Sequence, residues 1–221
     1  MLIFDKVCKR YPDTGDVLLD VNFQLHHGEM AFLTGHSGAG KSTLLKLIAI
    51  MEPCTRGQIF LDGRNLNETK EHHIPFVRRK LGLIFQDYKL LPDRTVFDNV
   101  ALPLVISGYG HQEIGRRVRA ALDKVGLLKK GKKYPLALSS GEQQRIGIAR
   151  AVINKPSLIL ADEPTGSLDP ELSSEVMRIF EQFQQVGVTI LIATHDINLI
   201  TRMGYRVLTL QNKQLMESVR L

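Results

Sequence analysis

The sequence predicts an α/β protein whose core sheet is mostly parallel and flanked by helices. Three apolar runs, at residues 30–34, 158–161 and 189–193, have the length and unbroken hydrophobicity of parallel strands that are covered on both faces. Directly after the first run, the stretch from Lys41 to Met51 carries apolar residues at helical spacings, and Pro53 ends the pattern. A strand followed by a helix is the repeating unit of an open parallel sheet.

The first 30 residues have a different pattern, which predicts a second sheet. Val21, Phe23 and Leu25 alternate with polar neighbours, as in a strand with one buried face. Residues 59–63 are interpreted as a further strand followed by a turn. We therefore expect an N-terminal antiparallel β subdomain packed beside the parallel sheet.

The middle of the chain, from about residue 87 to residue 155, is predicted to be rich in helices. It contains an apolar stripe with spacings of about four residues, typical of one buried helix face. The stripe consists of Ile114, Val118, Leu122 and Val125. We expect one domain over residues 1–221, in which about 1–86 and 156–221 form the core with its β subdomain. About 87–155 would form an inserted helical subdomain.

Composition sets limits on the partners and the compartment. The 221 residues include 29 basic and 23 acidic side chains, so the net charge of +6 suits either an anionic partner or a solvated basic surface. Two cysteines suggest no disulfide framework, which favours a reducing compartment. The N-terminus lacks a signal-peptide pattern. No apolar run approaches the roughly 20 residues that span a bilayer, so membrane contact is expected only through a partner or a surface.

A glycine-rich loop lies between the strand at 30–34 and the helix that follows it. It matches the phosphate-loop pattern Gly-x-x-x-x-Gly-Lys-Ser in the strand–loop–helix context that this motif requires. Glycines allow the backbone N–H groups to surround a phosphate, and the positive end of the helix dipole faces the anion. Lys41 is expected to neutralise phosphate charge, and Ser42 to bind Mg²⁺. The expected nucleotide-binding residues are Gly35, His36, Ser37, Gly38, Ala39, Gly40, Lys41, Ser42 and Thr43.

Two acidic residues, Asp162 and Glu163, follow the apolar run at 158–161. At the carboxyl end of a parallel strand, Asp162 is placed to complete the Mg²⁺ shell beside Ser42. Glu163 is expected to face another direction and to polarise an attacking water. A simple acidic strand cap is the alternative reading of this pair.

The segment Leu138-Ser-Ser-Gly-Glu-Gln-Gln-Arg145 resembles the signature motif of ABC (ATP-binding cassette) proteins. From here the resemblance covers essentially the whole chain, including the fold class of an ABC-type phosphate-loop NTPase. Tyr11 resembles the aromatic that stacks on adenine, Gln86 the Q-loop glutamine, residues 167–169 the D-loop, and His195 the switch histidine. Taken alone, Tyr11 fits a surface aromatic better, and His195 fits a structural histidine better.

The resemblance implies an ATPase that works as a head-to-tail homodimer with ATP and Mg²⁺. Each nucleotide would lie between the phosphate loop of one subunit and, from the other subunit, Ser139, Gly141, Glu142 and Asp169. The implied catalytic residues are Glu163, His195, Gln86 and Lys41, and the implied Mg²⁺ ligands are Ser42, Gln86 and Asp162. The motif departs from the family pattern at Ser140, where glycine is usual, and at Glu142, where glutamine is commoner.

Within the family, the chain most resembles the ATPases of bacterial cell-division complexes. The stretches that carry this likeness are 30–41, 122–128 and 193–200. It implies an integral membrane partner and a position on the cytoplasmic face of the inner membrane, at the division septum. The partner would dock near residues 86–103, where Leu90, Leu91 and Phe97 offer either apolar contacts or core packing. Lipoprotein-releasing and macrolide-exporting ABC ATPases are the near alternatives.

Three rival functions are less compatible with the sequence. A nucleic-acid-associated ABC ATPase would suit the positive charge, but such proteins carry coiled-coil or zinc insertions or a second cassette. This chain has no heptad run and no cysteine cluster, so no nucleic-acid partner is expected. A nucleotide kinase would need an acceptor site in place of the signature. A non-catalytic scaffold would not need Lys41, Asp162, Glu163 and His195 together.

Overall fold

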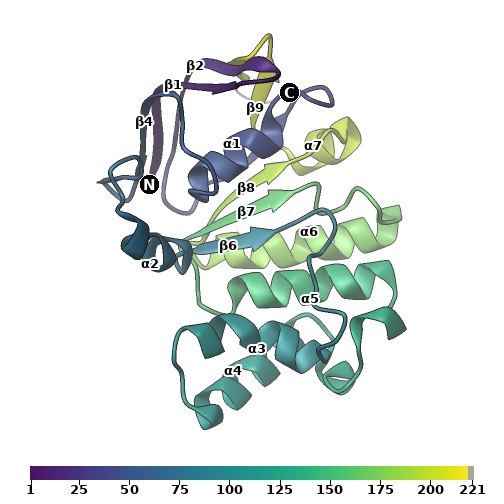
Figure 1. Ribbon diagram of the computed structural model, residues 1–221. Coiled ribbons are helices and arrows are strands. Elements are labelled where there is room, and N and C mark those ends of the chain that lie inside the picture. Colours follow the sequence, from purple (N-terminus) through teal and green to yellow (C-terminus); the bar gives the residue numbers. More distant parts are fainter. Residues whose placement is uncertain (219–221) are drawn as a thin grey trace.

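A computed structural model describes residues 1–218 and contains two sheets (Figure 1). The larger sheet has six strands in the order β10-β9-β3-β8-β7-β6. All neighbouring pairs are parallel except β9 and β10, which form an antiparallel hairpin at one edge. The strands are β3 (Met30–Thr34), β6 (Leu81–Ile84), β7 (Leu158–Asp162), β8 (Thr189–Ala193), β9 (Arg206–Gln211) and β10 (Gln214–Ser218). The predicted mostly parallel core is confirmed.

Both faces of this sheet are buried, as the unbroken apolar runs predict. In β3, Phe32 belongs to one hydrophobic cluster, and Ala31 and Leu33 belong to the other. In β8, Ile190 and Leu191 divide between the two clusters in the same way. Successive side chains of a strand point to opposite faces, so a strand buried on both sides requires a continuous apolar run.

The second sheet is antiparallel, with strand order β2-β1-β4-β5, and confirms the predicted N-terminal β subdomain. Its strands are β1 (Leu2–Tyr11), β2 (Gly15–Leu25), β4 (Arg56–Leu61) and β5 (Arg64–Asn65). Figure 1 shows it above α1 (Lys41–Ile48), which lies between the two sheets. Val21, Phe23 and Leu25 are buried, so the alternation in the sequence marks the inner face of this sheet.

The helix after the phosphate loop is shorter than predicted. It ends at Ile48 instead of Met51, and Ile50 has a left-handed backbone with φ of 52°. This conformation interrupts the helical hydrogen bonds and turns the chain back over α1. The remaining elements of the core are the 3₁₀ turn η1 (Glu71–His73) and the helices α2 (Ile74–Arg78), α6 (Pro170–Gln185) and α7 (Ile197–Met203).

Residues between β6 and β7 form three helices and two short 3₁₀ turns. The elements are α3 (Val96–Ile106), α4 (His111–Lys124), η2 (Leu128–Lys130), η3 (Pro135–Ala137) and α5 (Ser140–Val152). The predicted stripe from Ile114 to Val125 is buried. α5 contacts β6 as well as α3 and α4, and Figure 1 shows α3 and α4 farther from the sheet than α5. Among residues 1–218, no helix is long and apolar enough to cross a bilayer.

Candidate active site

The phosphate loop joins the carboxyl end of β3 to the first turn of α1, and its backbone requires glycine. Gly35 has φ of 148°, and a Cβ atom there would lie 2.5 Å from the Leu210 carbonyl oxygen. Gly40 caps α1 with φ of 107°, and a Cβ atom there would lie 3.0 Å from Val17 Cγ1. Side chains at either position would therefore distort the loop.

Lys41 is the first residue of α1, and its side chain folds back into the loop. It is only 8% exposed. Its ammonium group donates hydrogen bonds to the carbonyl oxygens of Gly35, at 2.9 Å, and His36, at 3.3 Å. Among the contacts of residues 1–218, the Lys41 ammonium is hydrogen-bonded only to neutral carbonyls. It is therefore available to an anion, because a phosphate oxygen is a stronger partner than a carbonyl.

Asp162 is the last residue of β7 and lies beside Ser42. Burial raises the pKa of the Asp162 carboxyl above its usual value, while a hydrogen bond with Ser42 and the charge of Lys41 oppose that shift. The neighbouring carboxylate of Glu163 raises the pKa further. A partly desolvated carboxylate therefore lies next to a hydroxyl group, and a bound cation would stabilise its charged form.

Glu163 lies one residue beyond β7 with φ of 46°, which is unusual for a residue with a side chain. This conformation turns its carboxylate away from the strand. Oε1 lies 2.7 Å from His195 Nδ1, and Oε2 accepts a hydrogen bond from the Thr194 hydroxyl at 3.2 Å. The carboxylate is therefore oriented by two residues at the end of β8, which is the arrangement expected of a general base.

One cavity of about 770 Å³ brings most of the predicted site together. Residues from β1, the phosphate loop, the segment after β6, and the ends of β7 and β8 meet there. Its predicted members are Tyr11, His36, Ser37, Gly38, Gly40, Lys41, Ser42, Thr43, Gln86, Asp162, Glu163 and His195. Gly35 and Ala39 belong to the loop but do not line the cavity. A ligand here contacts the carboxyl ends of the strands, as in other open α/β sheets.

The signature residues do not line this cavity. Ser139 caps α5, and the cap is reciprocal: the Ser139 hydroxyl accepts from the Glu142 N–H, while the Glu142 carboxylate accepts from the Ser139 N–H. The same carboxylate pairs with Lys130. Ser139 and Ser140 are exposed, whereas Gly141 is buried, and a Cβ atom there would lie 2.9 Å from Leu172 Cδ1. The cap therefore fixes the conformation at the N-terminus of α5, where Ser139 and Ser140 are exposed to solvent.

The segment that resembles the D-loop precedes α6. Asp169 caps this helix, because its carboxylate accepts hydrogen bonds from the backbone N–H groups of Glu171 and Leu172. Two residues earlier, the Ser167 hydroxyl lies 2.9 Å from the Tyr88 hydroxyl, two residues after Gln86. The segment after Gln86 and the D-loop segment are therefore in direct contact.

Several residues of the site were not predicted from the sequence. Thr194 is buried and orients Glu163, while Thr14 and Val17 line the cavity from the β1–β2 turn and the start of β2. Arg150 donates to the carbonyl oxygens of Tyr88 and Lys89 at 2.6 Å each. An arginine within an apolar helical stretch was the available signal for Arg150, because such a group requires a buried partner.

A phosphate loop, a partly buried strand-end aspartate, an oriented glutamate and a helix-capping signature together define a class: a nucleotide-hydrolysing phosphate-loop protein. The family model for "ABC transporter" matches residues 18–166. The chain therefore belongs to the ABC transporter family and is an ATP-hydrolysing cassette. It is 58% identical over 215 residues to the cell division ATP-binding protein FtsE of Escherichia coli K12, covering 97% of each chain. It is 44% identical to FtsE of Bacillus subtilis, covering 96% of this chain and 93% of that protein.

Solved structures agree with this assignment. A dimeric ATP-binding cassette in a post-hydrolysis state with bound ADP and Pi matches with a TM-score of 0.91 and 32% identity. A second dimeric structure, of a bacterial ABC transporter cassette, matches with the same TM-score and 33% identity. Both comparisons cover 100% of each chain.

Proposed function

We propose that this chain is the ATPase subunit of a bacterial cell-division complex. Its ATP-driven dimerisation would change the conformation of an FtsX-type membrane partner and so regulate cell-wall hydrolysis at the septum. The observation that carries this proposal is an ATPase cavity that the signature residues of the same chain do not line, so a second subunit would supply them. The chain that holds this cavity is 58% identical to a cell division ATP-binding protein. The dimer would lie on the cytoplasmic face of the inner membrane, held there by that partner.

In the proposed site, the phosphates of ATP occupy the loop from Gly35 to Thr43. Lys41 exchanges its two carbonyl partners for β- and γ-phosphate oxygens. Tyr11, at the β1 end of the cavity, stacks on the adenine.

The residues present fit Mg²⁺. Ser42 and Asp162 place a hydroxyl and a carboxylate together, and Gln86 lines the same cavity with an amide oxygen. Residues 1–218 contain no cluster of three or more His, Cys, Asp or Glu side chains suited to a metal ion. This agrees with a Mg²⁺ ion that takes its remaining ligands from phosphate and water. Bound there, Mg²⁺ would neutralise charge on the β- and γ-phosphates.

Hydrolysis is assigned to Glu163 and His195. Glu163 is oriented by Thr194 and His195, so its carboxylate can accept a proton as water attacks the γ-phosphorus. His195 is 69% exposed at its side chain, and it would turn from Glu163 toward the γ-phosphate when that group is present. Gln86, which lines the same cavity, would contact the γ-phosphate when that group is present.

The second wall of the site would come from another copy of the chain. Ser139 and Gly141 would present a hydroxyl and a backbone N–H at the N-terminus of α5 to the γ-phosphate. Glu142 would contribute by maintaining the helix cap. Asp169, at the start of α6, would hold the D-loop at the same interface.

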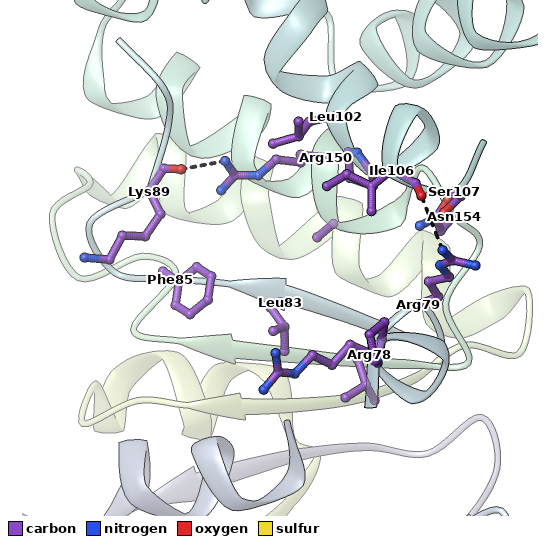
Figure 2. Close-up of a pocket in the computed structure, with 14 residues that line it drawn as sticks. Arg78, Arg79, Leu83, Phe85, Lys89, Leu102, Ile106, Ser107, Arg150 and Asn154 are labelled. Carbon is purple, nitrogen blue, oxygen red and sulfur yellow. Dashed lines mark hydrogen bonds between the residues drawn. The ribbon is translucent and has the colours of Figure 1, made fainter. Parts of the chain in front are cut away.

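A groove on the other side of the Q-loop segment is the proposed docking surface for the membrane partner. Figure 2 shows Leu83 and Phe85 of the β6 region opposite Leu102 and Ile106 of α3. The groove has a volume of about 530 Å³ and carries basic side chains at its edges, including Arg78, Arg79, Lys89 and Arg150. Leu90 and Phe97 pack against the chain's own core, and Leu91 does not line the groove. Of the two options left open by the sequence for Leu90 and Phe97, core packing therefore applies.

The partner can be tested by co-expression. We would express the chain with the FtsX-type protein of its own organism and, separately, with the lipoprotein-releasing and macrolide-exporting permeases. Membrane recruitment and stimulation of ATP hydrolysis by the FtsX-type protein alone would support the proposal. Recruitment by an export permease instead would assign the chain to that system. DNA-stimulated, salt-sensitive hydrolysis without any membrane protein would point to the nucleic-acid class.

A further inference from the structure

A partly buried ionic cluster lies beside Tyr11 at the edge of the nucleotide cavity. The Tyr11 hydroxyl donates to Glu52 Oε2 at 2.5 Å and lies 3.5 Å from the Thr43 hydroxyl. Glu52 also pairs with Lys9, at 3.2 Å, and with Lys46, at 3.5 Å. Tyr11 and Lys9 come from β1, whereas Thr43 and Lys46 come from α1. The cluster therefore joins the proposed base-binding residue to the helix that begins at the phosphate loop.

Lys9 is buried, and its ammonium group contacts Pro53 and Tyr11 as well as Glu52. It is 7% exposed, and its ammonium group donates to the Pro53 carbonyl oxygen at 2.8 Å. The same group lies 4.8 Å from the centre of the Tyr11 ring. A buried ammonium is costly unless it is paired and hydrogen-bonded, and Glu52 supplies the opposite charge. Because Lys9 covers one face of the ring, the opposite face is left for the ligand.

Glu52 is ionised at neutral pH. The hydrogen bond from Tyr11 and the contact with Lys9 hold the pKa of its carboxyl below the usual value, against the opposing effect of burial. Hydrogen bonds to a charged acceptor are stronger and more directional than neutral ones. The Tyr11 ring is therefore held at its hydroxyl by Glu52 and on one face by Lys9.

We propose that Glu52 and Lys9 are positioning residues that hold the Tyr11 ring ready for the base, at a fixed distance from the phosphate loop. This rests on the proposed role of Tyr11 in stacking on adenine. Without the cluster, the ring would sample other rotamers, and binding would have to order it. The cluster should therefore strengthen binding of the base while leaving binding of the phosphates unchanged.

The test compares ATP with inorganic tripolyphosphate, which has the phosphates but no base. Tyr11→Phe keeps the ring and removes the hydrogen bond, and Glu52→Ala removes the same bond from the other side. We expect either change to weaken ATP binding about three- to tenfold, the usual cost of ordering one side chain, with tripolyphosphate affinity unchanged. Glu68→Ala is the matched control, since it removes a carboxylate that pairs only with Asn65 among the contacts described.

Two results would overturn the inference. One is an unchanged ATP affinity in Tyr11→Phe, a variant that remains informative even if Glu52→Ala fails to fold. The other is an equal weakening of tripolyphosphate, which would mean that Glu52 acts on the phosphate loop. Tyr11→Ala separates this inference from the proposed function. Unchanged ATP affinity in Tyr11→Ala would show that Tyr11 does not stack on the adenine. Weakening in Tyr11→Ala but not in Tyr11→Phe would retain stacking and reject the positioning role.

Discussion

The nucleotide cavity and the proposed docking groove are built in different ways, although neighbouring residues contribute to both. Gln86 lines the cavity, whereas Phe85 and Lys89 line the groove. Most residues of the cavity come from short contiguous motifs at strand ends, such as 35–43 and 162–163. The groove takes two or three residues from each of α2, β6, α3 and α5, and no motif marks them. Its floor is apolar and its edges are basic (Figure 2). Chemistry that depends on backbone shape requires contiguous residues, whereas a docking surface requires only that separate side chains meet.

The two regions meet in the segment after Gln86. Tyr88 and Lys89 have left-handed backbones, with φ of 58° and 46°. Arg150 donates to the carbonyl oxygens of both residues, and Figure 2 shows its contact with Lys89 at the edge of the groove. Burial lowers the pKa of Arg150. A partly buried cation thus stabilises a strained turn between the groove and the cavity. This turn can couple the groove to the cavity, and substitutions in each region would show whether it does.

Glu163→Gln should reduce kcat by about 10²–10⁴-fold, because the amide cannot accept the proton of the attacking water. ATP binding should persist, so the variant should accumulate as a closed dimer. Single-turnover hydrolysis and size-exclusion chromatography with ATP would measure both effects. Hydrolysis at the wild-type rate would show that Glu163 is not the base.

Lys41→Ala should weaken ATP binding by about 2–5 kcal/mol, since it removes the buried cation that faces the phosphates. Titration with a fluorescent ATP analogue would measure the loss, with Lys132→Ala as a control for lost charge alone, because Lys132 is exposed and does not line the cavity. An unchanged affinity would reject the role given to Lys41.

Arg150→Ala should lower kcat by about tenfold, because a released turn misplaces Gln86, and one poorly held catalytic group has a cost of this order. The Mg²⁺ concentration needed for half-maximal activity should rise, since Gln86 is a proposed ligand. Arg206→Ala is a matched control: Arg206 is also partly buried and donates to a backbone carbonyl, but lies at the opposite edge of the core. If the Mg²⁺ dependence of Arg150→Ala matches that of the wild type, the turn held by Arg150 does not couple the groove to the cavity.

Ile106→Glu should weaken recruitment to membranes that contain the partner by about 1–2 kcal/mol, through loss of an apolar contact in the groove. Ile106 is 65% exposed, so folding should tolerate the change. Because this residue does not line the nucleotide cavity, ATP affinity should stay at the wild-type value. Co-sedimentation with partner-containing vesicles would measure recruitment. Undiminished binding would exclude this part of the groove from the interface.

Ser140→Gly should have the smallest effect, with ATPase activity unchanged or raised up to about twofold. Ser140 is exposed at the start of α5, and glycine there restores the usual signature pattern at little cost to the helix end. A steady-state ATPase assay is sufficient. A severe loss would show that the Ser140 hydroxyl takes part at the dimer interface.

The sequence by itself determined the fold class and the main nucleotide-binding elements. The runs at 30–34, 158–161 and 189–193 predicted three buried parallel strands, and the structure confirms all three. The early end of α1, and the elements α6, α7, β9 and β10, were not predicted. The β9–β10 hairpin turns at Asn212 and Lys213, both with positive φ, and a lysine at such a position gives a weaker turn signal than glycine.

Only the tertiary structure decided how the site is completed. Glu163 depends on Thr194 and His195, and Tyr11 depends on Glu52, across separations of 31 to 41 residues. The physical reason is that a phosphate loop is a local backbone conformation, which glycines and a helix N-terminus specify through their own geometry. Side-chain orientation depends on burial and charge that distant segments supply, and short sequence patterns do not encode which segments those are.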